Sequence, residues 1–277
     1  MAPDIVGSYM SIRSLVALTV ISVAPLAAQL ASPNAAGASI GHVHLNVRDI
    51  DSQQRFWGEL GGTSVSNGKL QMEQFPGIYV ILRKQDPTGG TVGSVVNHFG
   101  FHVKNLNDWL PKWKAAGIPI EAGNNPKQMF LTGPDNVRVE IIEDASIATP
   151  IAMHHIHMFL PDPLAAQAWY GKNFGAVAGK RNQFDTATVP GAELTFTKNE
   201  MPQVPTKGRS VDHIGFEVKN LDQFVKNLEA AGIHTEAPIR NSANAPKLRI
   251  AYITDPWGTY IELTEGLAPG AAQSARR

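Results

Sequence analysis

Apolar and polar residues alternate in four stretches of this chain, and each stretch begins a similar series of predicted elements. In Ile40–Val47 polar residues, two of them histidine, alternate with valine and leucine, which is the period of a β-strand with two different faces. Val95–Val103, Met153–Leu160 and Val211–Val218 have the same character. A helical pattern and shorter strand patterns follow each stretch. We therefore predict an α+β fold of four β-α-β-β-β units.

Residues that favour helix ends bound the predicted helices. Asp49 is placed to cap the first helix, which Gly61 and Gly62 terminate. Asp162 caps the third helix, with Pro163 at the first helical position. The second and fourth helices are predicted over Leu106–Ala116 and Leu221–Ala231. The remaining strands are predicted over 69–72, 77–83, 128–131, 137–142, 191–197, 248–254 and 260–264.

The four units form two related halves, because long stretches of the sequence occur twice. The repeated pairs are Gly41–Gly62 with His154–Gly175, Asn97–Ile118 with Asp212–Ile233, and Phe130–Glu143 with Tyr252–Glu265. One such unit is too small to bury a core alone and has to pair with another. We predict two domains, 40–143 and 151–265, each a pair of successive units. A signal peptide with a linker is predicted over 1–38 and a disordered tail over 266–277.

Charge and composition exclude several functions. The chain has 24 basic and 24 acidic residues, so the electrostatic footprint of nucleic-acid binding is missing. It contains no cysteine, which excludes disulfides, thiolate metal ligands and a cysteine nucleophile. The expected partner is a small molecule and no nucleic acid, and a homodimer is the larger assembly that we consider.

The first residues predict the location of the protein. Arg13 precedes the apolar run Leu15–Ala28, and small and polar residues follow. Such a run is typical of a secretory signal peptide and is too short to span a bilayer comfortably. We therefore expect a secreted or periplasmic protein without a stable membrane span. Sequencing of the native protein should place its first residue between 25 and 39, whereas an intact N-terminus on cytoplasmic protein would contradict the prediction.

The recurring histidines at the strand starts and the segment DPWGTYIEL, which begins at Asp255, resemble the vicinal oxygen chelate superfamily. That superfamily includes glyoxalase I, extradiol catechol dioxygenases and bleomycin-resistance binders, and the resemblance extends over nearly all of 40–265. It implies four βαβββ units paired into two glyoxalase/dioxygenase-like domains. In each domain, two units curl around one metal ion.

The resemblance also implies a set of metal ligands. Ligands in the superfamily come from the opening strands of two paired units and from a final strand. In the second half these places hold His155, His213 and Glu262. A second candidate set, in the first half, consists of His42, His98 and Glu140. Two imidazoles and a carboxylate suit a divalent ion such as Zn²⁺, Ni²⁺, Fe²⁺ or Mn²⁺ and leave open positions for two substrate oxygens.

Three functions are compatible with the resemblance, and single residues favour one or another. Glu193, in GAELTFT, stands where glyoxalase I has a further carboxylate ligand that can also move the substrate proton. It favours a metal-dependent lyase or isomerase that acts on a small oxygen-rich metabolite. Tyr252 stands where the Fe²⁺-dependent extradiol dioxygenases have a tyrosine, and His157 is a candidate acid or base. The alternatives are therefore a ring-cleaving dioxygenase and a non-catalytic small-molecule binder. We interpret the chain as an enzyme.

Overall fold

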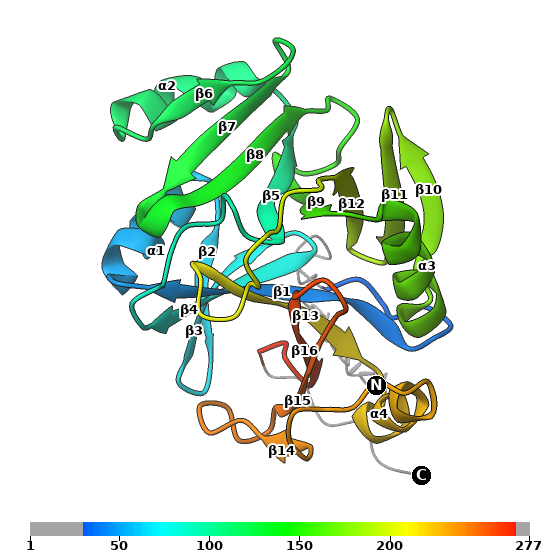
Figure 1. The fold of residues 1–277 in the computed structure, drawn as a ribbon. Helices are drawn as coiled ribbons and strands as arrows, with labels where there is room; N and C mark the ends of the chain where they lie inside the picture. The colour runs from blue at the N-terminus through cyan, green and yellow to red at the C-terminus, as the bar shows by residue number, and fades with distance from the viewer. Residues whose placement is uncertain (1–29, 270–277) are drawn as a thin grey trace, which may run out of the picture.

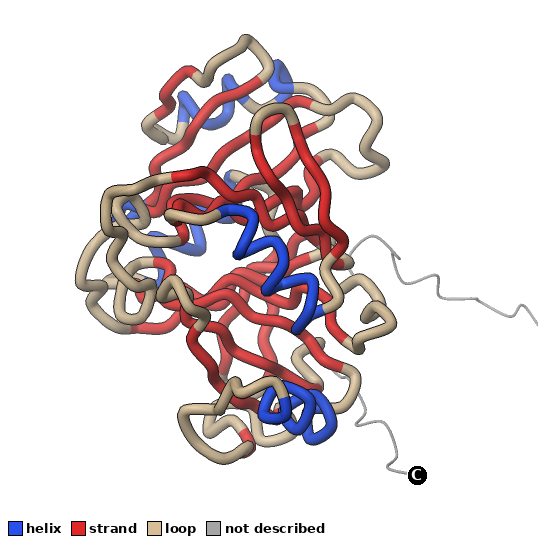
Figure 2. The backbone as a smooth tube through the Cα atoms, turned by 45° about the vertical axis from the view of Figure 1, so that its right-hand side comes forward, coloured by secondary structure: helices blue, strands red, loops and turns tan. Residues whose placement is uncertain are grey.

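The computed structural model describes residues 30–269, in which strands predominate and helices flank them (Figure 2). The predicted signal peptide lies outside the described residues, as does most of the predicted tail. The predicted disorder is wrong at the start of that tail. Leu267 is fully buried, and the amide of Gly266 donates a hydrogen bond of 2.7 Å to Glu217 Oε1.

The four β-α-β-β-β units are confirmed (Figure 1). The first contains β1 (Ala38–Val47), α1 (Ile50–Glu59), β2 (Thr63–Asn67), β3 (Leu70–Phe75) and β4 (Ile78–Lys84). The second contains β5 (Val96–Val103), the 3-10 helix η2 (Leu106–Asp108), α2 (Leu110–Ala115), β6 (Ile120–Ala122), β7 (Gln128–Gly133), the 3-10 helix η3 (Pro134–Asn136) and β8 (Val137–Glu143). The third contains β9 (Ile151–Leu160), α3 (Pro163–Phe174), β10 (Val177–Arg181), β11 (Phe184–Val189) and β12 (Ala192–Lys198). The fourth contains β13 (Val211–Val218), α4 (Leu221–Ala230), β14 (Arg240–Asn241), β15 (Arg249–Thr254) and β16 (Tyr260–Glu265).

The units pair across the two halves of the sequence. One eight-stranded sheet has the order β14-β15-β16-β13-β1-β4-β3-β2, and the other has the order β10-β11-β12-β9-β5-β8-β7-β6. The central antiparallel pairs are β1 with β13 and β5 with β9. The first sheet, called the β1–β13 sheet, therefore joins units one and four. The β5–β9 sheet joins units two and three. The prediction that the successive units of 40–143, and those of 151–265, pair with each other is thus wrong for the sheets.

The connecting segments explain this exchange. Residues 144–150 form a short link between β8 and β9, which keeps units two and three together. The two longer links, 85–95 and 199–210, cross from one sheet to the other and run side by side. Ser94 and Val204 form a parallel bridge there, and Val204 N donates to Gly93 O at 3.0 Å. Because the crossing links bind each other, they fix the two sheets in a single body.

Both sheets turn one face toward a common hydrophobic core that α1 and α3 help to fill (Figure 1). Trp57 of α1 stacks on Phe99 of β5 with ring centroids 5.7 Å apart. Phe174 of α3 packs against Phe216 of β13 at 4.3 Å. Complete burial of such a side chain contributes about 1.5–3 kcal/mol. Helix packing therefore holds the two units of each half together, whereas the sheets join units from different halves.

Local sequence explains where the predicted elements differ from the structure. The helix predicted over Leu106–Ala116 is divided into η2 and α2, because Pro111 at the start of α2 has no N–H to donate to an earlier turn. Strands β2, β6, β10, β11 and β14 were not predicted; all of them except β11 are largely exposed and lack a clear apolar face. Asp49 and Asp162 cap α1 and α3 as predicted. None of the helices within residues 30–269 is long and apolar enough to cross a membrane.

Candidate metal centres

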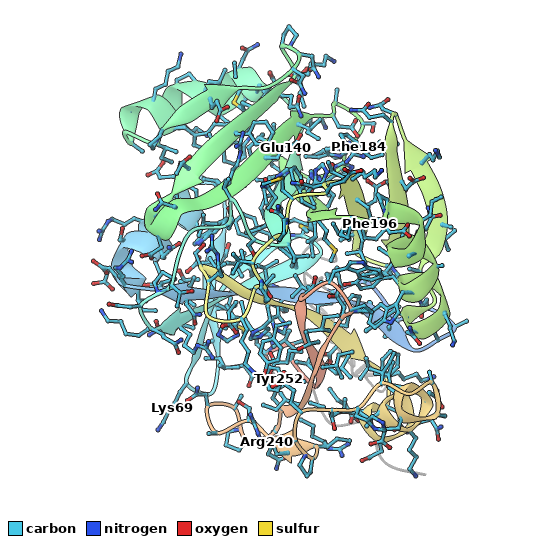
Figure 3. All side chains as sticks on the ribbon, viewed as in Figure 1. Lys69, Glu140, Phe184, Phe196, Arg240 and Tyr252 are labelled. Atoms are coloured by element: carbon cyan, nitrogen blue, oxygen red, sulfur yellow. The ribbon has the colours of Figure 1, made fainter. Side chains whose placement is uncertain are left out.

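The faces of the two sheets that point away from the common core each carry a buried group of three histidines and one glutamate. The β1–β13 site consists of His42, His44, His213 and Glu262. The β5–β9 site consists of His98, Glu140, His155 and His157. Within each group, one possible ligand atom per residue lies within 4.8 Å of every other. The two sites lie in different sheets: Glu140 is in the upper sheet of Figure 3, and Tyr252, which binds Glu262, is in the lower one.

Strand register brings the β1–β13 site together. His42 and His44 alternate along β1 and so share a face. His44 pairs with His213 across the sheet, and His42 pairs with Gly215. Gly215 in turn pairs with Glu262 of β16. A Cβ atom at Gly215 would overlap the imidazole ring of His42, so only glycine leaves room for this ring.

Two imidazoles converge on one carboxylate oxygen in the β1–β13 site. Glu262 Oε2 lies 2.9 Å from His42 Nε2 and 3.0 Å from His213 Nε2. Asp212 Oδ2 accepts a hydrogen bond of 2.7 Å from His213 Nδ1, which leaves Nε2 directed at Glu262. Tyr252 donates to the other oxygen, Oε1, at 2.5 Å. The Glu262 carboxylate and the His213 ring are therefore each fixed by a hydrogen bond on the side that faces away from the other ligands.

The site is electrostatically prepared for positive charge. Burial alone would raise the pKa of Glu262, but the imidazoles of His213 and His42 hold that pKa well below its ordinary value. Burial alone would lower the pKa of His213, but the carboxylates of Asp212 and Glu262 raise it. Burial lowers the pKa of His42 and also that of His44, so both rings are neutral. A neutral imidazole is the form that binds a metal ion.

The β5–β9 site repeats this plan with different supporting residues. Glu140 Oε2 lies 2.9 Å from His98 Nε2 and 3.0 Å from His155 Nε2. An amide, Asn97, replaces the aspartate behind the strand histidine and accepts from His98 Nδ1 at 2.9 Å. Burial lowers the pKa of His98 to about 4. The fourth histidine, His157, has both ring nitrogens in hydrogen-bond contacts, with His98 Nε2 (3.1 Å) and with Thr197 Oγ1 (2.7 Å).

Buried ring nitrogens without a hydrogen-bond partner show whether a metal ion fits these residues, because such an ion would pair them. Within residues 30–269 both ring nitrogens of His42 and of His44 are buried without a hydrogen-bond partner, as is His155 Nε2. His42 Nε2 is close to Glu262 yet not aligned with it as a hydrogen bond. Separations of 2.9–3.0 Å between neighbouring ligand atoms suit bonds of about 2 Å to a shared ion. The donors fit a divalent ion, and the fit is better in the β1–β13 site.

The two predicted ligand sets are wrong, because the units pair across the two halves of the sequence and not within them. His155 does not lie with His213 and Glu262 but in the β5–β9 site. Conversely, His42 does not lie with His98 and Glu140 but in the β1–β13 site. The members were placed correctly on their strands, but each set mixed residues of two sheets.

The fourth predicted ligand, Glu193, belongs to neither group. Its register partner is His155, so it shares the histidine face of the β5–β9 sheet. However, Glu193 Oε1 accepts hydrogen bonds from Arg181 Nε and Thr195 Oγ1, both at 2.8 Å. The carboxylate is therefore engaged by an arginine and is not one of the clustered ligand atoms, and no local pattern of residues indicates that ion pair.

His44 and Asp212 are the site residues that the sequence reasoning missed. His44 shares its strand face with His42, and the same alternation places His157 beside His155. That alternation was the available signal. Asp212 directly precedes a ligand histidine, where Asn97 stands in the other copy. Tyr252 and His157, predicted as candidate catalytic residues, do contact the sites, but they contact different ones.

The histidine faces of the two sheets differ in the apolar side chains that pack on them. On the β1–β13 sheet a second hydrophobic cluster covers the face; its buried members are Met72, Tyr79, Ile81, Ala245, Leu248, Ile250 and Leu267. On the β5–β9 sheet, Phe130, Phe159 and Phe184 are only half-buried. A hydrophobic cluster on the histidine face therefore distinguishes the β1–β13 sheet.

Glu217 lies on this covered face and predicts a pH dependence of stability. Burial raises the pKa of Glu217 to about 7, while Thr264 and two backbone amides oppose the rise. Since the folded pKa exceeds the unfolded one, this carboxyl stabilises the fold most below about pH 4 and loses that contribution as the pH rises through 7. Glu217→Gln should therefore be more stable than the parent at pH 8, by at most about 3 kcal/mol, and show no gain at pH 4. Urea unfolding at both pH values measures this, and an equal effect at both would contradict it.

Comparison with known proteins finds a family match for the second half of the chain. Residues 152–263 match the family model of the Glyoxalase/Bleomycin resistance protein/Dioxygenase superfamily. No curated protein matches the chain significantly. Glyoxalase I from Zea mays has a similar solved structure, with a TM-score of 0.66 and 17% identity over 82% of this chain and 92% of that one. A predicted dioxygenase from Bacillus subtilis has a TM-score of 0.62 and 14% identity over 87% of each chain. The resemblance seen in the sequence is thus confirmed, and residues 152–263 belong to the glyoxalase/bleomycin resistance protein/dioxygenase superfamily.

Proposed function

We propose that the protein is a divalent-metal enzyme that acts on a small, oxygen-rich molecule, and that its working centre is the β1–β13 site. The observation that carries the proposal is the burial of four unpaired ring nitrogens, on His42 and His44, beside Glu262. An unsatisfied buried polar atom costs about 1–3 kcal/mol. A divalent ion held by His42, His44, His213 and Glu262 would pair one nitrogen of each ring.

The chain's own residues would orient these ligands. Asp212 accepts from His213 Nδ1 and so directs Nε2 of this ring toward Glu262, and Tyr252 holds one oxygen of Glu262 so that the other faces the histidines. Hydrogen-bond partners of this kind typically change metal affinity by about 10–100-fold when they are removed. Zn²⁺, Ni²⁺, Fe²⁺ and Mn²⁺ all accept such ligands, and the bound ion would act as a Lewis acid on a substrate oxygen.

The role of His44 separates the two enzyme classes. As a fourth ligand it would take the place expected of Glu193 and favour a lyase or isomerase, which needs no redox chemistry. As a free base it would leave three ligands, the arrangement typical of non-haem iron oxygenases. Its ring centroid lies 4.3 Å from that of His213, and both of its nitrogens lack a hydrogen-bond partner within residues 30–269. We favour His44 as a ligand, and ring-cleaving oxygenation is the second candidate.

His44→Gln tests this assignment. We expect the variant to bind Zn²⁺ at least about 100-fold more weakly than the parent, since losing a ligand costs more than losing a hydrogen-bond partner of a ligand. A chelator competition assay measures the affinity. His157→Gln is the matched control, because His157 occupies the same strand position in the other site.

Turnover completes the test. Parent protein, prepared without oxygen and loaded with each of the four ions, is assayed with hemithioacetals and with a catechol panel. Oxygen-dependent ring cleavage with iron, together with unchanged metal affinity of His44→Gln, would establish the second candidate instead. Tight metal binding without turnover in either panel would favour a small-molecule binder.

A further inference from the structure

A small pocket adjoins the β1–β13 site. It has a volume of about 270 Å³, and its lining includes Arg83, Lys207, Asp212, Arg240, Tyr252 and Tyr260. Two of these residues touch the site directly, because Asp212 binds His213 and Tyr252 binds Glu262. The ring of Tyr260 lies 5.7 Å from that of His213. A ligand in this pocket would therefore rest against the supports of the metal ligands.

Three cationic side chains line this pocket, and each is held in place. Arg83 donates from Nε and Nη2 to Asn46 Oδ1, and Nη2 also lies 3.1 Å from Asp212 Oδ1. Lys207 forms an ion pair of 2.6 Å with Glu236 and lies over the Tyr260 ring. The guanidinium of Arg240 lies 5.6 Å from the centre of the Tyr252 ring, in the same part of the molecule in Figure 3.

The β5–β9 site does not repeat this set of cations. Strand register aligns Tyr79 with Glu193, because they face the matched residues His42 and His155. Counting along the strands, Arg83 then corresponds to Thr197, Asp212 to Asn97, and Tyr252 to Phe130. Thr197 contacts His157 instead of leaving a cation near the site. The cation at Arg83 is thus a property of one copy. An arginine beside the matched aromatic ring occurs in both copies, because Arg138 lies 4.0 Å from the centre of the Phe130 ring.

Charge balance indicates which anion suits the pocket. Arg83, Lys207 and Arg240 are accompanied by two carboxylates, Asp212 and Glu236. One positive charge remains, which matches a monoanion, whereas a phosphate dianion would leave negative charge uncompensated. Arginine presents paired N–H donors that match the two oxygens of a carboxylate. The volume lies just below the usual range for ligand pockets, about 300–1,000 Å³, and limits the ligand to a small one.

We propose that the substrate of the β1–β13 site is a small organic acid whose carboxylate is held by Arg240 and Arg83 and whose neighbouring oxygen faces the metal ligands. The second part of this statement rests on the proposed function, whereas the carboxylate contact depends on the pocket alone. Tyr252 and Tyr260, stacked with ring centroids 5.1 Å apart, would form the apolar wall against the carbon skeleton.

Binding of glycolate, a small acid with a neighbouring hydroxyl, tests the proposal. Saturation-transfer NMR measures binding to metal-free protein, and relaxation of the glycolate protons measures binding to Mn²⁺-loaded protein. We expect Arg240→Gln to raise the Kd of glycolate by about tenfold or more in both, since a hydrogen bond to a charged group contributes that much. Ethylene glycol, which lacks the carboxylate, should bind weakly and show no dependence on Arg240.

Two further variants sharpen the test. Arg181→Gln removes an arginine from the other site and should leave glycolate binding unchanged. Glu236→Gln releases Lys207 and should shift preference toward inorganic phosphate, because a second positive charge is then unpaired. Equal binding of glycolate and ethylene glycol, or equal losses in Arg240→Gln and Arg181→Gln, would overturn the proposal. If glycolate binding depends on Arg240 but no metal is retained, the carboxylate pocket stands and the proposed function fails. If metal is retained but glycolate binding does not depend on Arg240, the proposed metal site stands and the carboxylate pocket fails.

Discussion

Replacing His213 by alanine is expected to abolish retention of the tightly held divalent ion. His213 Nε2 lies 3.0 Å from Glu262 Oε2, and Asp212 directs that nitrogen toward the site. Its removal would delete a ligand and leave Asp212 buried without its imidazole partner. We expect the metal content of protein passed through a chelating column to fall from about one ion per chain to nearly none. Elemental analysis of the protein measures this directly.

The matched variants decide how the site is assembled. His42→Ala should have the same effect as His213→Ala, although the two residues belong to different halves of the chain. His155→Ala should leave the tight ion in place, because it removes a ligand of the other sheet. If His155→Ala and His213→Ala both release the tight ion and His42→Ala retains it, the assembly within one half, as the sequence repeat suggested, is the correct one. Release by His155→Ala alone would place the tight ion in the β5–β9 site.

Gly215→Ala is expected to disrupt the same site without removing any ligand. The added Cβ would occupy the space of the His42 imidazole, which has no room to move because it is fully buried. Overpacking of this kind typically costs about 1–3 kcal/mol of stability. The larger effect should be on metal affinity, which we expect to fall by more than about 100-fold because a ligand is displaced. Chelator competition and urea unfolding, measured on one preparation, separate the two effects.

Two other glycines serve as controls for this substitution. Gly100 occupies the equivalent place behind His155, and a Cβ there would lie 2.5 Å from His155 Cε1. Gly100→Ala should therefore disturb the β5–β9 site and spare the tight ion. Gly58 in α1 has open space around it, so Gly58→Ala should be tolerated and add up to about 1 kcal/mol of helix stability. Loss of the tight ion in Gly58→Ala would show that the Gly215 effect is not specific.

The repeat and the alternation of residues were sufficient to predict the units, most strands and the strand positions of most ligands. His42 and Glu262 were placed correctly because a period of two fixes which side chains share a face. The partner of each unit could not be predicted from these patterns. All four units carry similar signals, so β1 has equally good partners in β5 and β13 by sequence. The choice depends on the links, where Ser94 and Val204 meet in space.

The ion pair of Glu193 with Arg181 could not be predicted from the sequence for a related reason. A glutamate in a strand can face a metal ion, a cation or solvent, and the local pattern is the same in each case. Arg181 reaches it from β10, a strand whose residues are mostly exposed and which the apolar pattern does not indicate. Knowledge of the neighbouring strand was needed.

Along the chain, the pair β5–β9 lies between the two members of the pair β1–β13. This nesting sets the order in which the two pairs can form during synthesis. During synthesis β5 can pair with β9 once about 60 further residues have emerged, whereas β1 has to wait for β13, about 170 residues away. At synthesis rates of about 5–20 residues per second, the outer partner arrives roughly 10–30 s after β1 has left the ribosome. Throughout this interval β1 presents an unpaired edge with a fully apolar side, which is a template for aggregation. The inner sheet should therefore form first. The chain has most need of a chaperone while the β13 side of β1 is unpaired, because only the other side of β1 pairs with β4 of its own unit.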